Sequence, residues 1–412
     1  MDKEQIGIPK LRFPGFTGAW EQRRLGDYLS IPTKEPITDI NELKLMTLKL
    51  NLEGITLSAN RETLKLGATK YYKRHEGQLL YGKQNFFHGS IALIPKEAEG
   101  YATSGDVPAL DISNVNSKYL VDYISRPSYF KAKEALATGT GSKRIHEKTL
   151  LNFKIAVPSL EEQNAISDFI TNYTNLIALH QRKLEHLKQQ KNGLLQKMFP
   201  KNGESVPDVR FPGFTDPWEQ RKLGDQMYIK ARIGWQALKK DEYMETGDFY
   251  LITGTDIDES RHIVDLSRCF YVSEERYDMD KKIQLQNGDI IVTKDGTIGK
   301  VAMVTDLDKP ATLNSHLFVL RDLSGHLDKY FLLTILSSDI FKSFVESTKT
   351  GSTLTGLPQK TIVKFKFQIP SIQEQRKIST LFKSVDSLIA LYQRKLEHLE
   401  LLKKGLLQQM FV

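Results

Sequence analysis

The chain lacks the features that mark several protein classes. Its 412 residues include a single cysteine, Cys269, so a disulfide within the chain and a cysteine-based zinc site are both excluded. No apolar run approaches the roughly 18 residues of a membrane span. The opening residues, MDKEQIGIPKLRF, lack the apolar core of a signal peptide. We therefore expect a soluble protein that stays in the reducing cytoplasm.

Motifs of the common catalytic sites are also missing. Gly299-Lys300 is followed by valine, and Lys294 stands where a phosphate-binding loop requires glycine. Gly139 and Gly141 form a two-glycine fragment that follows a predicted helix, whereas a dinucleotide fingerprint follows a strand. HExxH, GxSxG and the Asn/Asp-Pro-Pro-aromatic tetrapeptide of amino-methyltransferases do not occur. We assign no catalytic residue and no metal ligand.

Charge and length point to the kind of partner and the number of domains. Lysine and arginine number 58 against 50 aspartates and glutamates, for a net charge of +8. A positive balance favours an anionic partner, with nucleic acid ahead of a membrane surface, although a solvated basic surface without such a partner is equally common. The length is enough for two hydrophobic cores.

Two stretches of the sequence occur twice. RFPGFTGAWEQRRLGD begins at Arg12 and recurs as RFPGFTDPWEQRKLGD from Arg210. LIALHQRKLEHLKQQKNGLLQKMF begins at Leu176 and recurs as LIALYQRKLEHLELLKKGLLQQMF from Leu388. The ends of the two copies match while their middles differ, which indicates one framework that carries two different contents.

A long helix is predicted at the end of each copy. The segments VPSLEEQ (157–163) and IPSIQEQ (369–375) place a capping serine after proline, with Glu and Gln in the first turn. Apolar residues then follow at alternating spacings of three and four, which predicts a coiled-coil seam, with a long helix on a globular core as the alternative. The simplest pairing joins the two matching helices of one chain. The predicted seam consists of Ile170, Tyr173, Ile177, Leu184, Leu187, Lys191 and Leu194 in the first copy and of Phe382, Val385, Ile389, Leu396, Leu399, Lys403 and Leu406 in the second.

The variable middles are typical of mixed α/β structure. Residues 77–95 and 288–305 each contain two β-rich runs around a loop, and the loop tips differ between the copies. A helical stretch (118–137 and 327–348) and a Gly-Ser loop (139–144 and 349–356) follow in each. This pattern predicts a common scaffold with interchangeable loops.

The three repeated motifs together resemble the specificity subunit of type I restriction–modification systems. These are the FPGF…W…LG opening, the P-S-x-x-EQ entry and the QRKLEHL…LLQ-x-MF helix, which occur in this order, twice, from Arg12 to Phe411. The resemblance implies a noncatalytic DNA-recognition subunit of a DNA adenine methyltransferase and restriction complex. It further implies two target-recognition domains, each for one half of a bipartite target, on an antiparallel coiled coil with pseudo-two-fold symmetry. The implied partners are double-stranded DNA, two methyltransferase subunits with S-adenosylmethionine, and motor–nuclease subunits with ATP and Mg. No cofactor is implied in this chain.

Loop side chains with hydrogen-bonding edges are the candidates for DNA contact. Arg and Lys match guanine, and Asn and Gln match adenine, while many further contacts reach only phosphates. For each candidate the alternative is a solvated loop. The candidates are Lys83, Gln84, Asn85, His88, Ser142, Lys143 and Arg144 in the first copy and Lys230, Arg232, Lys294, Asp295, Thr297, Ser352, Thr353 and Thr355 in the second.

The expected fold class is α+β, with two similar mixed α/β recognition domains at residues 1–156 and 210–368. Helices at 157–199 and 369–412 and a linker at 200–209 complete the expected organisation. A coiled-coil scaffold or adaptor that holds two protein-binding domains is the alternative function, and an enzyme acting alone, such as a nuclease, is a third.

Overall fold

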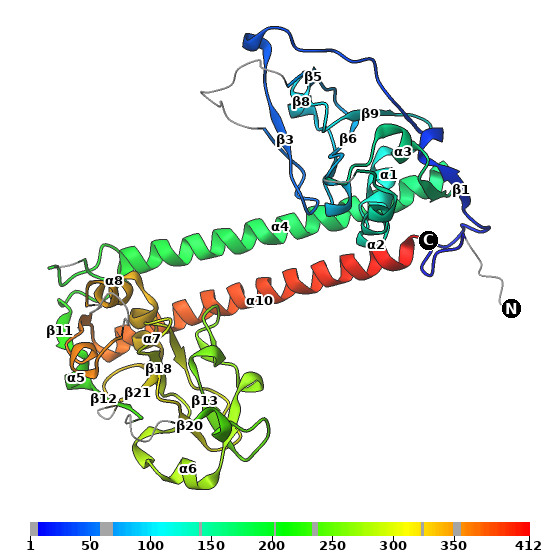
Figure 1. Cartoon of the computed structure of the whole chain (residues 1–412). Helices are drawn as coiled ribbons and strands as arrows, with labels where there is room; N and C mark the ends of the chain where they lie inside the picture. The colour runs from blue at the N-terminus through cyan, green and yellow to red at the C-terminus, as the bar shows by residue number, and fades with distance from the viewer. Residues whose placement is uncertain are drawn as a thin grey trace. The chain divides into compact units, whose positions relative to one another are not determined.

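The computed structural model describes residues 7–57, 69–139, 142–201, 203–232, 238–322, 325–348 and 356–412. The chain forms two compact units (Figure 1). The first unit contains the chain up to Leu179 together with Glu397–Val412, and the second unit contains His180–Leu396. Each unit therefore contains one variable segment and parts of both long helices.

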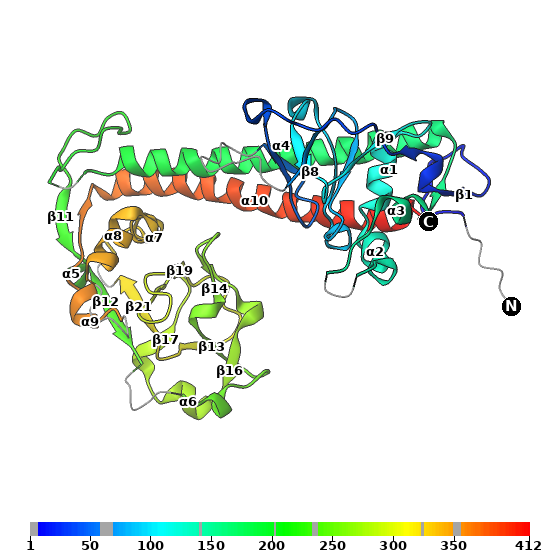
Figure 2. The same ribbon diagram turned by 45° about the horizontal axis from the view of Figure 1, so that its top comes forward.

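Two long helices, α4 (Leu160–Met198) and α10 (Ile372–Met410), are the longest elements, with 39 residues each. In the first unit the beginning of α4 packs beside the end of α10, where Ile166 and Ile170 share a core with Met410. In the second unit the beginning of α10 packs beside the end of α4, where Phe382 shares a core with Met198 (Figures 1 and 2). The start of one helix thus meets the end of the other in each unit, which confirms the predicted antiparallel coiled coil.

The repeated P-S-x-x-EQ motif starts both helices. The Ser159 hydroxyl accepts a hydrogen bond from the backbone N–H of Glu162 at 3.3 Å, and Ser371 does the same for Glu374 at 3.4 Å. These are the N-caps that the sequence predicts. A proline-marked entry with a capping serine therefore sets the first residue of each long helix.

The first unit combines small antiparallel sheets with short helices. Strands β6 and β7 pair antiparallel from Leu79↔Leu93 to Tyr81↔Ile91, as the predicted β-rich runs require. One sheet has the strand order β2 (Leu29–Ser30), β9 (Ala109–Ile112), β6 (Leu79–Tyr81), β7 (Ile91–Leu93). The other strands form two-stranded sheets in which β1 (Glu21–Arg24) pairs with β10 (Lys154–Val157), β3 (Met46–Leu48) with β4 (Ile55–Leu57), and β5 (Tyr71–Lys73) with β8 (Ala102–Ser104). The short helices are α1 (Ser117–Ile124), α2 (Pro127–Phe130) and α3 (Glu147–Leu151).

The second unit has larger sheets on the same plan. Strands β18 and β19 pair antiparallel from Ile290↔Met303 to Val292↔Val301, which makes them the counterpart of β6 and β7. One sheet has the strand order β12 (Met227–Ala231), β21 (Leu317–Asp322), β18 (Ile290–Thr293), β19 (Val301–Met303), β15 (Ile263–Val264), β14 (Ile257–Asp258). A second sheet has the order β16 (Phe270–Val272), β13 (Phe249–Ile252), β20 (Ala311–Leu313), β17 (Gln284–Leu285). Strand β11 (Glu219–Lys222) pairs with β22 (Lys366–Ile369) in a two-stranded sheet. The helices are α5 (Leu223–Gln226), α6 (Glu274–Asp278), α7 (Lys329–Ser337), α8 (Asp339–Thr348) and α9 (Gln359–Ile362).

The entry of the chain into each unit is also repeated. Leu11 N–H donates to the carbonyl of Gln409 near the end of α10 at 2.9 Å, and Val209 N–H donates to Lys197 near the end of α4 at 2.8 Å. A buried tryptophan follows in each case, Trp20 in the first unit and Trp218 in the second. The repeated FPGF…W opening therefore docks onto the end of whichever long helix its unit receives. None of the helices in the described part of the chain has the length and apolar composition that a membrane span requires.

Candidate nucleic-acid interface

Bidentate ion pairs attach the opening of each copy to the start of its own helix. Arg12 donates to Glu162 from Nε and Nη2, both at 2.7 Å, and Arg210 donates to Glu374 at 2.7 and 2.8 Å. Both carboxylates are buried. Because a bidentate pair fixes position and angle together, these clamps hold the opening segment of each copy against the start of its long helix.

The glutamine of the same motif makes a second attachment. Gln163 accepts from the backbone N–H of Asn116, the N-cap of α1, at 2.9 Å, and Gln375 accepts from Asp328, the N-cap of α7, at 2.9 Å. The repeated motif residues therefore hold the framework together, and the candidates for ligand contact lie in the segments that differ.

In each unit the residue that follows the predicted Gly-Ser loop bonds to the start of the predicted hairpin loop. The N–H of Ile145, at the end of the first Gly-Ser loop, donates to the carbonyl of Lys83 at 2.8 Å. The equivalent bond in the second unit runs from Leu357 to Lys294 at 2.6 Å. Segments that lie far apart in sequence are therefore joined next to the tip of the central hairpin. The side chains at this junction differ between the units.

In the first unit the junction holds Gln84 and Arg144. With the Gln84 amide oriented to satisfy its surroundings, its oxygen accepts from Nη2 of Arg144 at 2.6 Å and from Nε at 3.2 Å. Asp106, on the turn between β8 and β9, lies 3.2 Å from Nη1 of Arg144. Lys83 pairs with Glu147 at 2.9 Å, and both side chains are largely buried, so Lys83 braces α3.

The remaining first-unit candidates lie around this group. His88 and Ser142 are exposed, and the backbone carbonyl of Asn85 accepts from the N–H groups of His88 and Ser90 at 3.0 Å each. Lys143 pairs with Glu134 at 2.8 Å, but both side chains are about half exposed. An exposed pair of this kind is weak, so Lys143 is free to exchange its partner for a phosphate.

In the second unit the junction holds an acid and a histidine. Asp295 pairs with Nδ1 of His316, and the amine of Lys294 lies 5.9 Å from the centre of the Phe318 ring. Thr297 is exposed, and its carbonyl accepts from the Thr293 hydroxyl. Lys294 and Asp295 line a pocket of about 360 Å³ with residues 356–359.

The other second-unit candidates are divided between solvent, the interior and segments outside the described residues. Lys230 on β12 is half-buried, with its amine 5.5 Å from the centre of the Tyr228 ring. Arg232 is only 2% exposed and donates to the Leu313 carbonyl at 2.8 Å and the Thr312 hydroxyl at 3.1 Å, which argues for a structural role. Three candidates lie outside the described residues, namely Ser352, Thr353 and Thr355.

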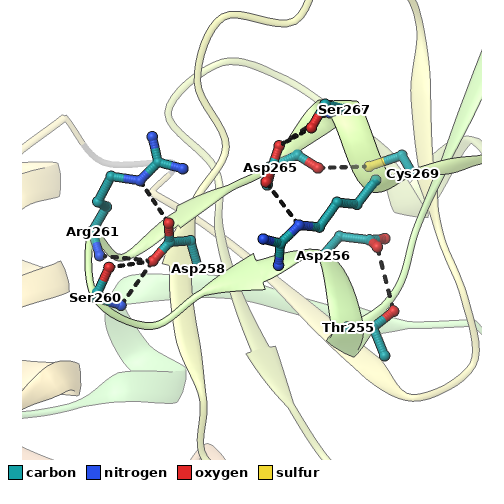
Figure 3. A network of polar contacts seen from close by, with 9 residues as sticks. Thr255, Asp256, Asp258, Ser260, Arg261, Asp265, Ser267 and Cys269 are labelled. Carbon is teal, nitrogen blue, oxygen red and sulfur yellow. Dashed lines mark hydrogen bonds and ion pairs between the residues drawn. The ribbon is translucent and has the colours of Figure 1, made fainter. Parts of the chain in front are cut away.

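A polar network stabilises the β14–β15 hairpin of the second unit (Figure 3). Burial opposes ionisation of Asp258, but hydrogen bonds from Ser260 and Arg261 outweigh it and lower the pKa of Asp258 to about 2. Asp265 accepts from the Ser267 hydroxyl at 2.6 Å, and the buried Cys269 thiol, whose pKa burial raises, donates to the Asp265 carbonyl at 3.6 Å. The network is satisfied internally and holds the hairpin in shape. Within the described ranges, no three His, Cys, Asp or Glu side chains come together in an arrangement suited to a metal ion.

All residues of the predicted coiled-coil seam are buried or half-buried on α4 and α10. In the second unit Leu184, Leu187 and Ile389 form one apolar cluster. The seam lysines are accommodated by polar partners: Lys191 pairs with Asp386 at 2.7 Å, and Lys403 donates to Thr174 at 2.8 Å.

Sequence reasoning missed the partners that position the candidates. Asp106 and His316 give no local signal, since each meets its partner only through the fold. The clamp residues Arg12 and Glu162 could have been found, because both recur at the matching positions Arg210 and Glu374.

Comparisons with known proteins place these repeats in a family. The model described as "Type I restriction modification DNA specificity domain" matches twice, over residues 18–189 and 215–401. The type I restriction enzyme MjaVIII specificity subunit of Methanocaldococcus jannaschii is 24% identical over 94% of this chain and 91% of its own length. The EcoR124I/EcoR124II specificity subunit of Escherichia coli is 28% identical over 38% of each chain.

Solved structures show the same fold. The S subunit of a type I restriction–modification system from M. genitalium matches with a TM-score of 0.59 at 16% identity, over 98% of this chain and 99% of that one. A structure from work on complex assembly and conformational transition of the type I R-M system matches with a TM-score of 0.54 at 16% identity, again over 98% and 99%.

Proposed function

Since the chain belongs to the type I restriction–modification DNA specificity family and is a specificity subunit without catalytic function, we propose that it selects a bipartite DNA target. In this proposal each unit recognises one half-site. The chemistry of methyl transfer and cleavage belongs to partner subunits.

One observation carries the proposal. The same backbone bond joins the hairpin to the residue after the Gly-Ser loop in both units, from Ile145 to Lys83 and from Leu357 to Lys294. The next side chain is Gln84 in one unit and Asp295 in the other. A repeated scaffold with different hydrogen-bonding groups at the same point is what two half-sites of different sequence require.

The coiled coil is the part that would set the distance between the half-sites. Each helix is about 58 Å long, from 39 residues at about 1.5 Å each. Deleting one heptad from both helices, residues 184–190 and 396–402, should shorten the preferred spacer by about three base pairs, since seven residues rise about 10 Å. An unchanged spacer would mean that the coil does not set it.

Exposed leucines on the two long helices suggest where the methyltransferase subunits dock. Leu176 and Leu179 on α4 are exposed, and so are their counterparts Leu388 and Leu391 on α10. Neither pair belongs to the seam. Because the same apolar pair occurs once on each helix, two copies of one partner can bind in equivalent ways.

The bound subunits would supply the cofactors. Each methyltransferase subunit would bring S-adenosylmethionine, and motor–nuclease subunits would bring ATP and Mg. The specificity subunit itself would contribute DNA contacts and the docking surfaces.

Mapping of methylated adenines tests the proposal. In cells that carry the chain with its methyltransferase subunits, the map should return two half-sites and a fixed gap. Exchange of residues 28–156 for the matching segment of a relative should change one half-site and leave the other as it was. A change in both half-sites would contradict independent recognition.

A scaffold that binds only proteins would behave differently. The purified chain should bind a random DNA duplex at low salt, and its affinity should fall steeply as the salt concentration is raised, because phosphate contacts release counterions. Absence of binding at low salt would favour the scaffold.

A further inference from the structure

We propose that Arg144, positioned by Gln84 and Asp106, recognises a guanine in the half-site of the first unit; this rests on the proposed function, in which that unit recognises one half-site. Three segments that are distant in sequence bring the group together. Gln84 follows β6, Asp106 lies between β8 and β9, and Arg144 pairs through its backbone with Thr138, at 2.8 and 3.0 Å.

The hydrogen bonds leave one edge of the guanidinium available. An arginine has five N–H donors. Gln84 occupies the Nε–H and one N–H of Nη2, and the ion contact with Asp106 is made at Nη1. One N–H on Nη2 and one on Nη1 remain at the end of a side chain that is 39% exposed, and in this proposal they form the fork that meets the base. Two parallel donors match the O6 and N7 acceptors of guanine in the major groove.

The surrounding groups strengthen the choice of base. The Gln84 oxygen is engaged by Arg144, so the amide can present only its NH₂ donors. Adenine and cytosine carry amino donors at their major-groove edges and would meet donors here. The neighbouring cation Lys83 is already committed to Glu147, so Arg144 is the cation of this junction that is positioned for a base.

The group also reduces what binding would cost. A free arginine side chain loses considerable rotamer entropy when it is held in one orientation. Gln84 and Asp106 already hold the guanidinium plane before DNA arrives. In the second unit Gly356 precedes Leu357 where Arg144 precedes Ile145, and Asp295 replaces Gln84, so the described residues of the second unit do not repeat this group at the matching positions.

Selection of bound duplexes from a random library tests the inference with the full-length chain in complex with its methyltransferase subunits. For wild type, the half-site of the first unit should contain a guanine that Arg144→Ala changes to any base, with an about ten- to hundred-fold loss of preference. Gln84→Ala should keep the guanine but lower the preference for it by several fold. The half-site of the second unit should stay unchanged in both variants.

Lys143→Ala is the matched control, because it removes a cation from the same loop. It should weaken binding to all sequences equally and reduce the dependence on salt without altering any base preference. Arg144→Met, with its melting temperature compared with wild type, serves if Arg144→Ala does not fold.

Two results would overturn the inference while leaving the proposed function intact: a first half-site without guanine, or variants of Arg144 that fold and retain every base preference. Failure of the wild-type complex to select any sequence would instead contradict the proposed function.

Discussion

Each unit has a lysine in the coiled-coil seam, and the two units differ in where the aspartate and the threonine near that lysine lie. In the second unit Lys191 of α4 pairs with Asp386 of α10 at 2.7 Å, and the Tyr330 hydroxyl donates to the same carboxylate at 2.7 Å. Burial, then the nearby Lys191 charge, lowers the pKa of His262 on the β14–β15 hairpin, so the hairpin lies close to this pair.

In the first unit the matching lysine is Lys403, and threonine stands where the second unit has aspartate. Lys403 donates to Thr174, the counterpart of Asp386, at 2.8 Å. The nearby carboxylate is Asp122 of α1, whose counterpart on α7 is Thr334. Aspartate and threonine have thus changed places between the long helix and the short one. The comparison teaches that a carboxylate lies near the seam lysine in both units although its position in the chain has changed, because a nearby carboxylate favours the charged form of an ammonium group from whichever side it approaches.

The largest effect on stability should come from breaking the clamps, the ion pairs Arg12–Glu162 and Arg210–Glu374. Glu374→Gln should lower the free energy of unfolding by about 3–5 kcal/mol, since it leaves Arg210, whose side chain is only 12% exposed, without its countercharge. Glu162→Gln should cost at least about 1 kcal/mol less, because Arg12 also donates to the carbonyls of Gly18 and Thr17, whereas Nη1 of Arg210 has no partner in the described residues. Urea unfolding followed by tryptophan fluorescence measures both. Equal losses would mean that the carbonyls contribute nothing.

Removing the seam carboxylates should come next. Asp386→Thr should lower the free energy of unfolding by about 3 kcal/mol, because it leaves Lys191 and the Tyr330 hydroxyl without their common partner in a nearly buried site. Asp122→Thr should cost less than about 1 kcal/mol, because Lys403 keeps Thr174 and a desolvated carboxylate is removed. Thermal unfolding of the two variants makes the comparison.

The exchange itself can be tested by restoring the carboxylate from the other side. Adding Thr334→Asp to Asp386→Thr should restore at least about 1 kcal/mol of the lost free energy of unfolding. In the wild-type background Thr334→Asp should give no gain in stability. Further destabilisation of the double variant would show that the two positions are not interchangeable.

A smaller effect should appear in the pH dependence of the first unit. Burial raises the pKa of Asp122 to about 6, against the opposing charges of Lys403 and Lys118. The folded state therefore holds this proton more tightly than the unfolded state, whose aspartate titrates near pH 4. The contribution of Asp122 to stability is present below about pH 4 and is lost as the pH rises to about 6.

The measurement compares wild type with Asp122→Asn between pH 4 and 7. As the pH rises across this window, the free energy of unfolding of wild type should fall by about 2 kcal/mol relative to that of the variant. This figure follows from about 1.4 kcal/mol per pKa unit, reduced because the side chain has some contact with solvent. A difference that does not vary with pH would show that Asp122 titrates normally.

The smallest effects are expected at the exposed leucines of the two helices. Leu179→Gln and Leu391→Gln should each change the stability of the isolated chain by less than about 0.5 kcal/mol, since neither side chain is buried. Each should nevertheless weaken binding of one methyltransferase subunit, which titration calorimetry would detect. A large loss of stability would place these leucines in the packing of the chain itself.

Much of the framework could be predicted because it is written in local signals. The serine caps at Ser159 and Ser371, the three-four spacing of the seam and the β-rich runs around each loop act over a few residues. Duplication added a further signal, because a residue that recurs at its matching position, as Arg12 recurs at Arg210, belongs to the framework.

By itself, the sequence determined that the chain contains two copies of one α+β framework, that each copy ends in a seam-forming helix, and where the loops that differ begin and end. Only the tertiary structure decided which side chains meet: Asp106 with Arg144, His316 with Asp295, and Asp122 near Lys403. Helix periodicity and capping act along neighbouring residues, whereas the orientation and countercharge of a loop side chain depend on segments that only folding brings within a few ångströms.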